Sequence, residues 1–122
     1  MKKPKILITG SSGFIGKQLV KKLYKKNNLF LLDKKKISSK NTKFFKINLL
    51  NKTSLENFFK KNKVDIIIHL ASEIFDDDKN VYYYNTKTSQ NLIAMAKKYK
   101  VNNFIFTSTF SIYEKNYDLP IK

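Results

Sequence analysis

Apolar residues along the chain fall into two kinds of segment, which alternate from one end to the other. Short, nearly continuous apolar runs are typical of strands that are buried on both faces of a sheet. Longer segments in which apolar residues recur every three or four positions are typical of helices with one buried face. The runs that predict strands cover residues 5–9, 29–32, 42–47, 64–70 and 101–106. The segments that predict helices cover residues 14–26, a short stretch from residue 53, and residues 81–98.

Particular residues predict the ends and faces of these helices. Asn27 and Asn28 predict the end of the first helix. The sequence Thr53-x-x-Glu56 predicts a capping box at the start of the second helix. The apolar face of that helix consists of Leu55, Phe58 and Phe59. The third helix is predicted to bury one stripe, which consists of Val81, Tyr84, Thr88, Leu92, Met95 and Tyr99.

The order of the predicted elements indicates the topology of the sheet. Strands that alternate with helices predict βαβ units with right-handed crossovers, and hence a parallel sheet. The polar segment 34–41 is too short for a full crossover helix. We therefore expect an α/β fold with a doubly wound parallel sheet of five strands in the order 3-2-1-4-5. A ligand is expected at the carboxyl ends of strands one and four.

The glycines of the chain, Gly10, Gly13 and Gly16, all lie between the first strand and the first helix. Gly10 would permit a tight turn, Gly13 would let the backbone approach a diphosphate, and Gly16 would let the helix pack closely. The backbone N–H groups near Phe14 and Ile15 would then point at the anion. The pattern Gly-x-x-Gly-x-x-Gly in this position favours a dinucleotide site over a simple turn.

Asp33 follows the second strand and is a candidate ligand of the adenosine ribose. A carboxylate there can accept hydrogen bonds from both ribose hydroxyls, and it would repel a 2′-phosphate. NAD is therefore favoured over NADP, although the lysines at 34–36 could neutralise that repulsion. The alternative is that Asp33 is an ordinary residue of a turn. Ser12, inside the glycine turn, is a further candidate for contact with the cofactor.

Composition limits the classes of partner. The 122 residues correspond to one domain or part of one, and the formal net charge of +16 raises the possibility of a nucleic-acid partner. All the basic residues are lysines spread along the chain, whereas recognition of bases and phosphates favours arginine. We interpret the charge as a solvated background and keep nucleic-acid binding as a minor alternative. The chain has no cysteine and no apolar run long enough to span a bilayer, so we expect a cytoplasmic protein without a membrane partner.

Two other groups of side chains are candidates for chemistry. His69 is the only histidine, so it has no second histidine to join it as a metal ligand. We expect it to be a structural residue at the end of a strand. The carboxylates Asp76, Asp77 and Asp78 resemble a metal cluster, but they precede a helix, where acidic residues suit the helix dipole. No metal site is therefore expected.

Together, these motifs resemble those of the extended short-chain dehydrogenase/reductases, in particular the NAD-dependent epimerases and dehydratases of nucleotide sugars. Residues 9–16 are similar to the family's cofactor turn, and residues 31–33 are similar to its ribose-binding segment. The resemblance covers nearly the whole chain. It implies a Rossmann-type domain that binds NAD.

Further segments carry the same resemblance. The pair at 48–49 falls where the family contacts the adenine ring, with Asn in place of the usual Asp. The stretch 69–72 resembles a His-x-Ala segment beside the cofactor, and Asn85 resembles the asparagine of the helix that follows. The additional cofactor contacts that the resemblance implies are Asn48, Leu49, Leu70, Ala71, Ser72 and Asn85.

The segment 103–109, followed by Ser-Ile-Tyr at 111–113, resembles the strand that delivers the family's catalytic hydroxyl, here Thr109. Glu114 replaces the glycine that usually follows. In the family, a Tyr-x-x-x-Lys pair on the next helix deprotonates a sugar hydroxyl as hydride leaves for the nicotinamide. That pair is missing here after Thr109. Tyr83 and Lys87 have its spacing but lie on the earlier helix, and we regard this as coincidence.

The resemblance implies that residues 1–122 are the NAD-binding portion of an enzyme acting on a nucleotide sugar. The domain would be incomplete, without the later strands, the catalytic helix and the substrate-binding part, and a full-length form could be a homodimer. A non-catalytic module that responds to NAD is the alternative. The apolar edge of the last strand, 104–106, predicts poor solubility or self-association of the isolated chain.

Overall fold

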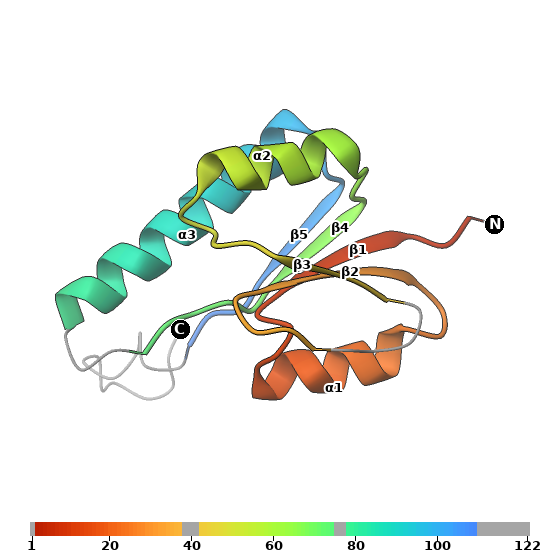
Figure 1. Cartoon of the computed structure of the whole chain (residues 1–122), viewed down its shortest axis with the longest axis horizontal. Coiled ribbons are helices and arrows are strands. Elements are labelled where there is room, and N and C mark those ends of the chain that lie inside the picture. The colour runs from red at the N-terminus through yellow and green to blue at the C-terminus, as the bar shows by residue number, and fades with distance from the viewer. Residues whose placement is uncertain (1, 38–41, 75–77, 110–122) are drawn as a thin grey trace, which may run out of the picture.

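The computed structural model describes residues 2–37, 42–74 and 78–109, except for the side chain of Asp78. The strands form one parallel sheet in the order β3-β2-β1-β4-β5 (Figure 1). The strands are β1 (Lys5–Thr9), β2 (Asn28–Asp33), β3 (Thr42–Lys46), β4 (Ile66–His69) and β5 (Asn103–Phe106). The helices are α1 (Phe14–Leu23), α2 (Lys52–Lys61) and α3 (Asp78–Lys98). The predicted doubly wound, Rossmann-type sheet and its strand order are confirmed.

Helices cover both faces of the sheet: α1 lies on one face, and α2 and α3 lie on the other (Figure 1). Successive residues of a strand point to opposite faces. In β1, Ile6 and Ile8 therefore join the core under α1 with Val20, whereas Leu7 joins the core under α2 and α3. Because both faces are covered, the central strands are apolar without alternation, as the sequence predicted.

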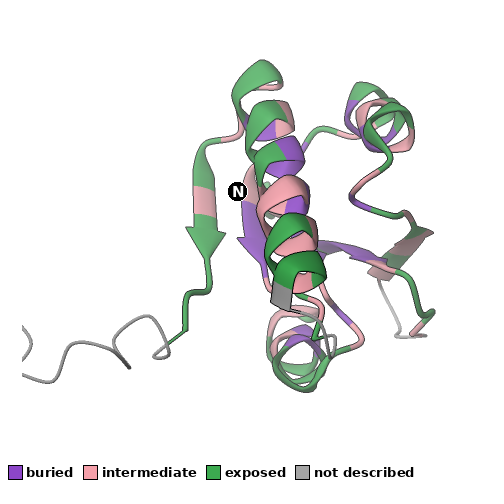
Figure 2. Cartoon of the chain, turned by 90° about the vertical axis from the view of Figure 1, so that its left-hand side faces the viewer, coloured by how far each residue is buried: buried purple, intermediate pink, exposed green. Residues whose placement is uncertain are grey.

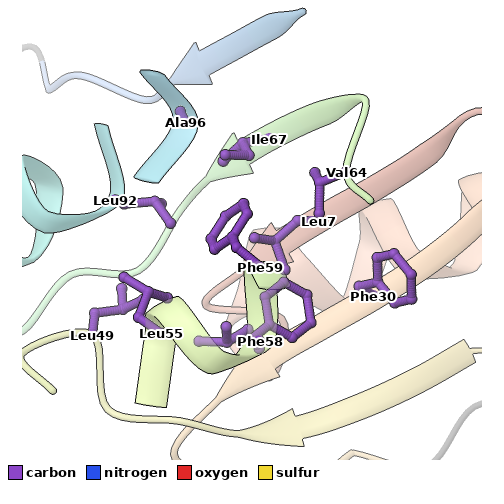
Figure 3. Packing of buried hydrophobic residues seen from close by; sticks show 11 residues of the cluster. Leu7, Phe30, Leu49, Leu55, Phe58, Phe59, Val64, Ile67, Leu92 and Ala96 are labelled. Atoms are coloured by element: carbon purple, nitrogen blue, oxygen red, sulfur yellow. The ribbon is translucent and has the colours of Figure 1, made fainter. Parts of the chain in front are cut away.

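The larger core lies between the sheet and helices α2 and α3 (Figure 3). Phe58 of α2 packs on two strands: its ring lies edge-to-face on Phe30 of β2 at a centroid distance of 5.7 Å and on Phe45 of β3 at 4.8 Å. Leu92 brings α3 into the same cluster. This packing fixes α2 and α3 over one face, so that the loops before them emerge at the carboxyl edge of the sheet.

Helix α1 ends at Leu23, three residues before the predicted end. The carbonyl oxygen of Leu23 accepts hydrogen bonds from the backbone N–H groups of Lys26, at 3.2 Å, and Asn27, at 3.1 Å. The side-chain amide of Asn27 also donates to it, at 3.0 Å. Asn27 is therefore the stop residue that the sequence predicted, but it closes a turn that residues 24–26 form outside the helix.

The predicted capping box of the second helix is wrong. The N-cap of α2 is Asn51, whose side-chain oxygen accepts a hydrogen bond from the backbone N–H of Ser54 at 3.0 Å. Thr53 is thus already inside the helix. Glu56 faces α3 instead, where it forms an ion pair with Lys98, and it lies 4.0 Å from Lys60.

The last two strands are shorter than predicted, and the long helix starts three residues earlier. Asp65 lies directly before β4: its backbone N–H donates to Lys5 O at 2.9 Å, and its carboxylate accepts from Lys5 N at 2.9 Å. Its carbonyl oxygen takes the N–H groups of Asn102 and Asn103. The predicted stripe of α3 is fully buried only in its middle, at Thr88 and Leu92; its remaining members, Val81, Tyr84, Met95 and Tyr99, are half-buried.

Strand β5 forms one edge of the sheet and is largely exposed (Figure 2). Ile105 and Phe106 are 50% and 57% exposed. No strand in the described part of the chain pairs with the outer edge of β5. The predicted apolar edge is therefore present, whereas self-association stays a prediction.

The described helices include none that combines the length and the apolar character needed to cross a bilayer.

Candidate functional site

The turn between β1 and α1 has a backbone that requires glycine at its first position. Gly10 has φ +69°, and a Cβ atom there would lie 2.7 Å from the backbone nitrogen of Ala71. The segment after β4 therefore packs directly on this turn. The N–H of Gly10 donates to Leu32 O at 3.0 Å, which ties the turn to β2 as well. The predicted tight turn is confirmed.

Gly16 and Gly13 have different surroundings. A Cβ atom on Gly16 would collide with Gly10 O and would lie 2.8 Å from Ser11 Cα, so α1 packs on the turn itself. A Cβ atom on Gly13 would meet only Gly10 O, at 3.3 Å, and would otherwise project into open space. Gly13 thus leaves open space above the backbone of the turn.

The N-terminus of α1 opens at this turn. Its N-cap is Gly13, which has no side chain to cap the helix, and its first turn contains no acidic residue. Phe14 and Ile15, the first two residues of the helix, are 86% and 57% exposed. Uncapped N–H groups and the positive end of the helix dipole make this terminus suitable for an anion.

Asp33 lies beside the same turn, at the end of β2. Its Oδ2 accepts from the backbone N–H of Ser12 at 2.8 Å and from the Ser12 hydroxyl at 2.7 Å. Its Oδ1 accepts from the N–H groups of Lys34, at 2.6 Å, and Lys35, at 3.3 Å. Burial raises the pKa of Asp33, but the hydrogen bonds from Ser12 and from these backbone amides outweigh burial and lower the pKa below its usual value. Asp33 is therefore a fixed carboxylate next to the uncapped helix.

Ser11 was missed by sequence reasoning. Its side chain is fully buried in the turn, and its hydroxyl is the buried side-chain oxygen that has no hydrogen-bond partner among the described residues. Nothing in the sequence separates Ser11 from Ser12, since both are serines between Gly10 and Gly13. Only the backbone of the turn directs one inward and the other to Asp33.

A buried hydrogen-bond chain lies beneath the site and runs through His69. The Nδ1 atom of His69 is 2.7 Å from Thr9 Oγ1, and its Nε2 atom is 2.9 Å from Ser89 Oγ. Because Ser89 already donates its proton to Asn85 O, at 2.8 Å, it accepts from Nε2–H. Thr9 therefore donates to an unprotonated Nδ1 while it accepts from Ala71 N–H at 3.3 Å. This pattern assigns a neutral Nε2–H imidazole.

Burial supports the same protonation state, because it lowers the pKa of His69 to about 4. The ring is 1% exposed. The carbonyl oxygen of His69 accepts from the Thr107 hydroxyl at 3.1 Å. His69 thus joins β1, α3 and the segment after β5, and the expectation of a structural role at a strand end agrees with these contacts.

Asn85 of α3 holds the segment that follows β4. Its Oδ1 accepts from the backbone N–H of Glu73 at 2.8 Å, and its Nδ2 donates to Glu73 O at 3.1 Å. Leu70, Ala71 and Ser72 are therefore held between β4 and this clamp. A direct contact of Asn85 with a cofactor stays a prediction.

The structure places Asn48 and Leu49 after β3, in the connection to α2. Asn48 Oδ1 accepts from Leu50 N at 3.0 Å, which forms a turn. The Leu49 side chain is 4% exposed and belongs to the larger core, and its carbonyl oxygen accepts from Asn91 Nδ2 at 2.9 Å. The side chain of Leu49 is thus packed inward, and contact of this pair with adenine stays a prediction.

Two loops of the site are joined by Lys34, which directly follows Asp33. Lys34 Nζ forms an ion pair with Glu73 and lies 4.5 Å from the centre of the Tyr84 ring. The hydrogen bond to Glu73 raises the pKa of Lys34, against a smaller opposing effect of burial. Sequence reasoning did not find this pair, because nothing links residues 34 and 73 before the strands are placed.

Thr109 lies beyond the end of β5 and is exposed. It follows the Thr107 hydroxyl that is anchored on His69 O, so the backbone leading to it is fixed near the end of β4. Residues 111–113 and Glu114 lie outside the described residues, as do Asp76 and Asp77.

A cleft of about 370 Å³ opens at the opposite, amino edge of the sheet. Its lining residues include Lys5, Asn28 and Lys43, which begin or nearly begin their strands, and none from the glycine turn. Ligands of open parallel sheets bind at the carboxyl edge. We therefore base the site on the glycine turn and Asp33, where the polar groups converge, rather than on this cleft.

Comparisons with known proteins agree with the geometry. The chain matches the model of the NAD dependent epimerase/dehydratase family over residues 6–122. The dTDP-D-glucose 4,6-dehydratase of Dictyostelium discoideum is 37% identical over 130 residues, which cover 89% of this chain and 30% of that protein. The UDP-Glc/GlcNAc 4-epimerase of Campylobacter jejuni superposes with a TM-score of 0.82 at 29% identity, over 90% of this chain and 38% of that one.

A UDP-glucose 4-epimerase of Thermus thermophilus, solved in complex with NAD, superposes with a TM-score of 0.79 at 25% identity, over 86% of this chain and 37% of that one. The chain thus spans between 30% and 38% of the length of these proteins. The family model, in contrast, covers almost all of the chain. On this match, the protein belongs to the NAD-dependent epimerase/dehydratase family.

Proposed function

We propose that the chain is the cofactor-binding portion of an NAD-dependent enzyme that epimerises or dehydrates a nucleotide-linked sugar. One observation carries the proposal: the Asp33 carboxylate is bound to Ser12 in the glycine turn, beside the uncapped start of α1. An acceptor for ribose hydroxyls and donors for a diphosphate therefore lie side by side. The related proteins from D. discoideum and C. jejuni are named for nucleotide-sugar substrates, which supports the substrate class.

In this proposal the glycine turn holds the diphosphate. Gly10 and Gly16 bring β1, the segment after β4 and α1 close together, and Gly13 leaves space over the backbone. The backbone N–H groups of Phe14 and Ile15 would donate to the phosphates, and Ser12 would keep Asp33 in place for the ribose.

The remaining cofactor contacts line the same edge. Asn48 and Leu49 would border the adenine, with Leu49 acting through its backbone because its side chain is in the core. Leu70, Ala71 and Ser72 would lie along the other side of the cofactor, in the segment that Asn85 holds. Asp33 favours NAD, since its charge opposes a 2′-phosphate.

We place the substrate near Thr109, whose hydroxyl would hydrogen-bond the reacting hydroxyl of the sugar. The nicotinamide, when bound, supplies the group that accepts and returns a hydride. Thr107 and His69 hold the backbone that leads to Thr109. The sequence after Thr109 contains no Tyr-x-x-x-Lys pair, so no residue of this sequence is assigned the proton transfer. We also propose a cytoplasmic location and a homodimer of the full-length form.

The proposal is tested by titrating the purified chain with NAD in a calorimeter. Asp33→Asn should weaken binding about tenfold, because it replaces a charged acceptor of the ribose. Asp65→Asn is the matched control: this carboxylate also accepts a backbone N–H, from Lys5, but lies at the amino edge. It should leave the affinity unchanged. The absence of binding by the folded wild-type chain would refute the proposal.

A further inference from the structure

Lys34, Glu73 and Tyr84 meet at the carboxyl edge of the sheet although they come from three different elements. Lys34 follows β2, Glu73 follows β4, and Tyr84 belongs to α3. The ammonium group of Lys34 donates to Glu73 Oε1 and lies 4.5 Å from the centre of the Tyr84 ring. The Lys34 and Glu73 side chains remain 46% and 28% exposed. The ion pair therefore spans from the β2 side of the glycine turn to its β4 side.

The position of Lys34 gives this pair a consequence for cofactor choice. Lys34 is the residue directly after Asp33, the proposed ligand of the adenosine ribose. A free cation at this position would neutralise the charge of a 2′-phosphate and would favour NADP. In the structure, the charge of Lys34 is compensated by a carboxylate on the opposite loop and its side chain is directed there.

The carboxylate of Glu73 is itself well positioned. Both backbone groups of Glu73 are bound by the side chain of Asn85, with distances of 2.8 Å to the N–H and 3.1 Å to the carbonyl oxygen. The Glu73 main chain is therefore fixed against α3. Its carboxylate stays on the β4 side of the turn, so that Lys34 must extend across to reach it.

We propose that Glu73 is a specificity-determining residue, which holds Lys34 away from the adenosine ribose and thereby favours a dinucleotide without a 2′-phosphate. This inference rests on the proposed function. Asp33 repels the 2′-phosphate directly, whereas Glu73 acts through Lys34, by withholding the charge of the first of the three lysines that follow Asp33. Glu73 is thus a positioning residue rather than a cofactor ligand.

Glu73→Gln tests the inference by removing the carboxylate while keeping the size of the side chain. NAD and NADP are titrated separately into the purified chain, and the ratio of the two dissociation constants is compared with that of the wild type. We expect the preference for NAD to fall about three- to fivefold, the size of a partly exposed charge interaction. The change should shrink at high salt.

Two further variants isolate the role of Lys34. In the double variant Glu73→Gln/Lys34→Gln the gain in NADP binding should disappear, because no cation remains to be released. Glu56→Gln breaks the ion pair of Glu56 with Lys98 between α2 and α3 and changes the net charge by the same unit. It should leave the NAD preference unchanged. Glu73→Ser provides a second neutral side chain if Glu73→Gln fails to fold, as judged by thermal unfolding.

The outcomes separate this inference from the proposed function. If the wild type binds NAD but Glu73→Gln and Glu73→Ser leave its preference unaltered, the role of Glu73 is wrong and the proposed function stands. An equal shift in Glu56→Gln would likewise overturn the role, since it would show an effect of net charge alone. If the folded wild type binds neither dinucleotide, the proposed function fails first, and this inference fails with it.

Discussion

His69 joins two strands and a helix through one uncharged imidazole. Its ring accepts from Thr9 and donates to Ser89, so each nitrogen has a single role that a protonated ring could not fill. The sequence indicated a strand-end residue but not these partners, because they lie 60 and 20 residues away. The glycines were easier to predict, since Gly10 needs a backbone that other residues avoid. Ser11 and Ser12 were indistinguishable until the turn itself was placed.

The protonation of His69 predicts a loss of stability in mild acid. Its pKa is about 4 in the folded chain, against 6.5 when unfolded. As the pH falls through 6.5, the imidazole therefore binds a proton in the unfolded state but not in the folded state. The free energy of unfolding should drop by about 2 kcal/mol between pH 7 and pH 5. Urea unfolding at several pH values measures this.

The variant His69→Asn serves as the comparison for that measurement. It should be less stable than the wild type at pH 7, because it disrupts the contacts to Thr9 and Ser89, and nearly independent of pH between 7 and 5. His69 is the only histidine of the chain, so no other imidazole contributes. If the free energies of unfolding of the two proteins change with pH in parallel, the His69 ring does not stay neutral in the folded chain.

At the scale of elements, the spacing of apolar residues and the length of each apolar segment predicted which helices and strands form. They did not predict where each element begins. Strands β1 to β3 lie within one residue of their predicted ends, because apolar runs limit them closely. The start of α2 was misplaced because Thr53 and Glu56 match a capping box, while Asn51 caps the helix two residues earlier. Whether Asn51 or Thr53 caps the helix depends on the direction from which the chain enters the helix. The sequence pattern does not give this direction.

The cap of α2 can be tested by a pair of substitutions. Asn51→Ala should lower the free energy of unfolding by about 1 kcal/mol, because it removes the acceptor of the Ser54 N–H. Thr53→Ala should have little effect or a slightly stabilising one, since it places a better helix former inside the helix. Chemical denaturation of both variants gives the comparison. A larger loss of stability for Thr53→Ala than for Asn51→Ala would show that Thr53, and not Asn51, caps the helix.

At the scale of the whole molecule, helices cover both faces of the sheet, whereas β5 stays largely exposed in the part of the chain that the structure describes. The strand order was predictable because the connection from β2 to β3 is short and the others carry helices. The site arises from this order: only when β2 and β4 flank β1 do Asp33, the glycine turn and the segment after β4 meet. The contact between Lys34 and Glu73 depends on this strand order and on the directions of the two side chains. The pattern of apolar and polar residues along the sequence therefore could not predict it.

The exposed edge of β5 predicts association of the 122-residue chain. Sedimentation velocity should show larger species as concentration rises, because an open apolar strand can pair with another copy. Ile105→Lys should shift the distribution toward the monomer. Ile93→Lys is the matched control, since Ile93 is 51% exposed, as against 50% for Ile105, but lies on α3. If Ile105→Lys and Ile93→Lys reduce association equally, the association depends on exposed apolar surface in general and not on the edge of β5.

The alternation of β1 between two cores limits how this gene can change. Inserting one codon between Lys5 and Thr9 would exchange which of the two cores the side chains of part of the strand enter. The threonine hydroxyl could no longer face the histidine ring if its side changed, and an aliphatic side chain would take its place. Length variation in relatives of this chain should therefore concentrate in the connections and spare this strand.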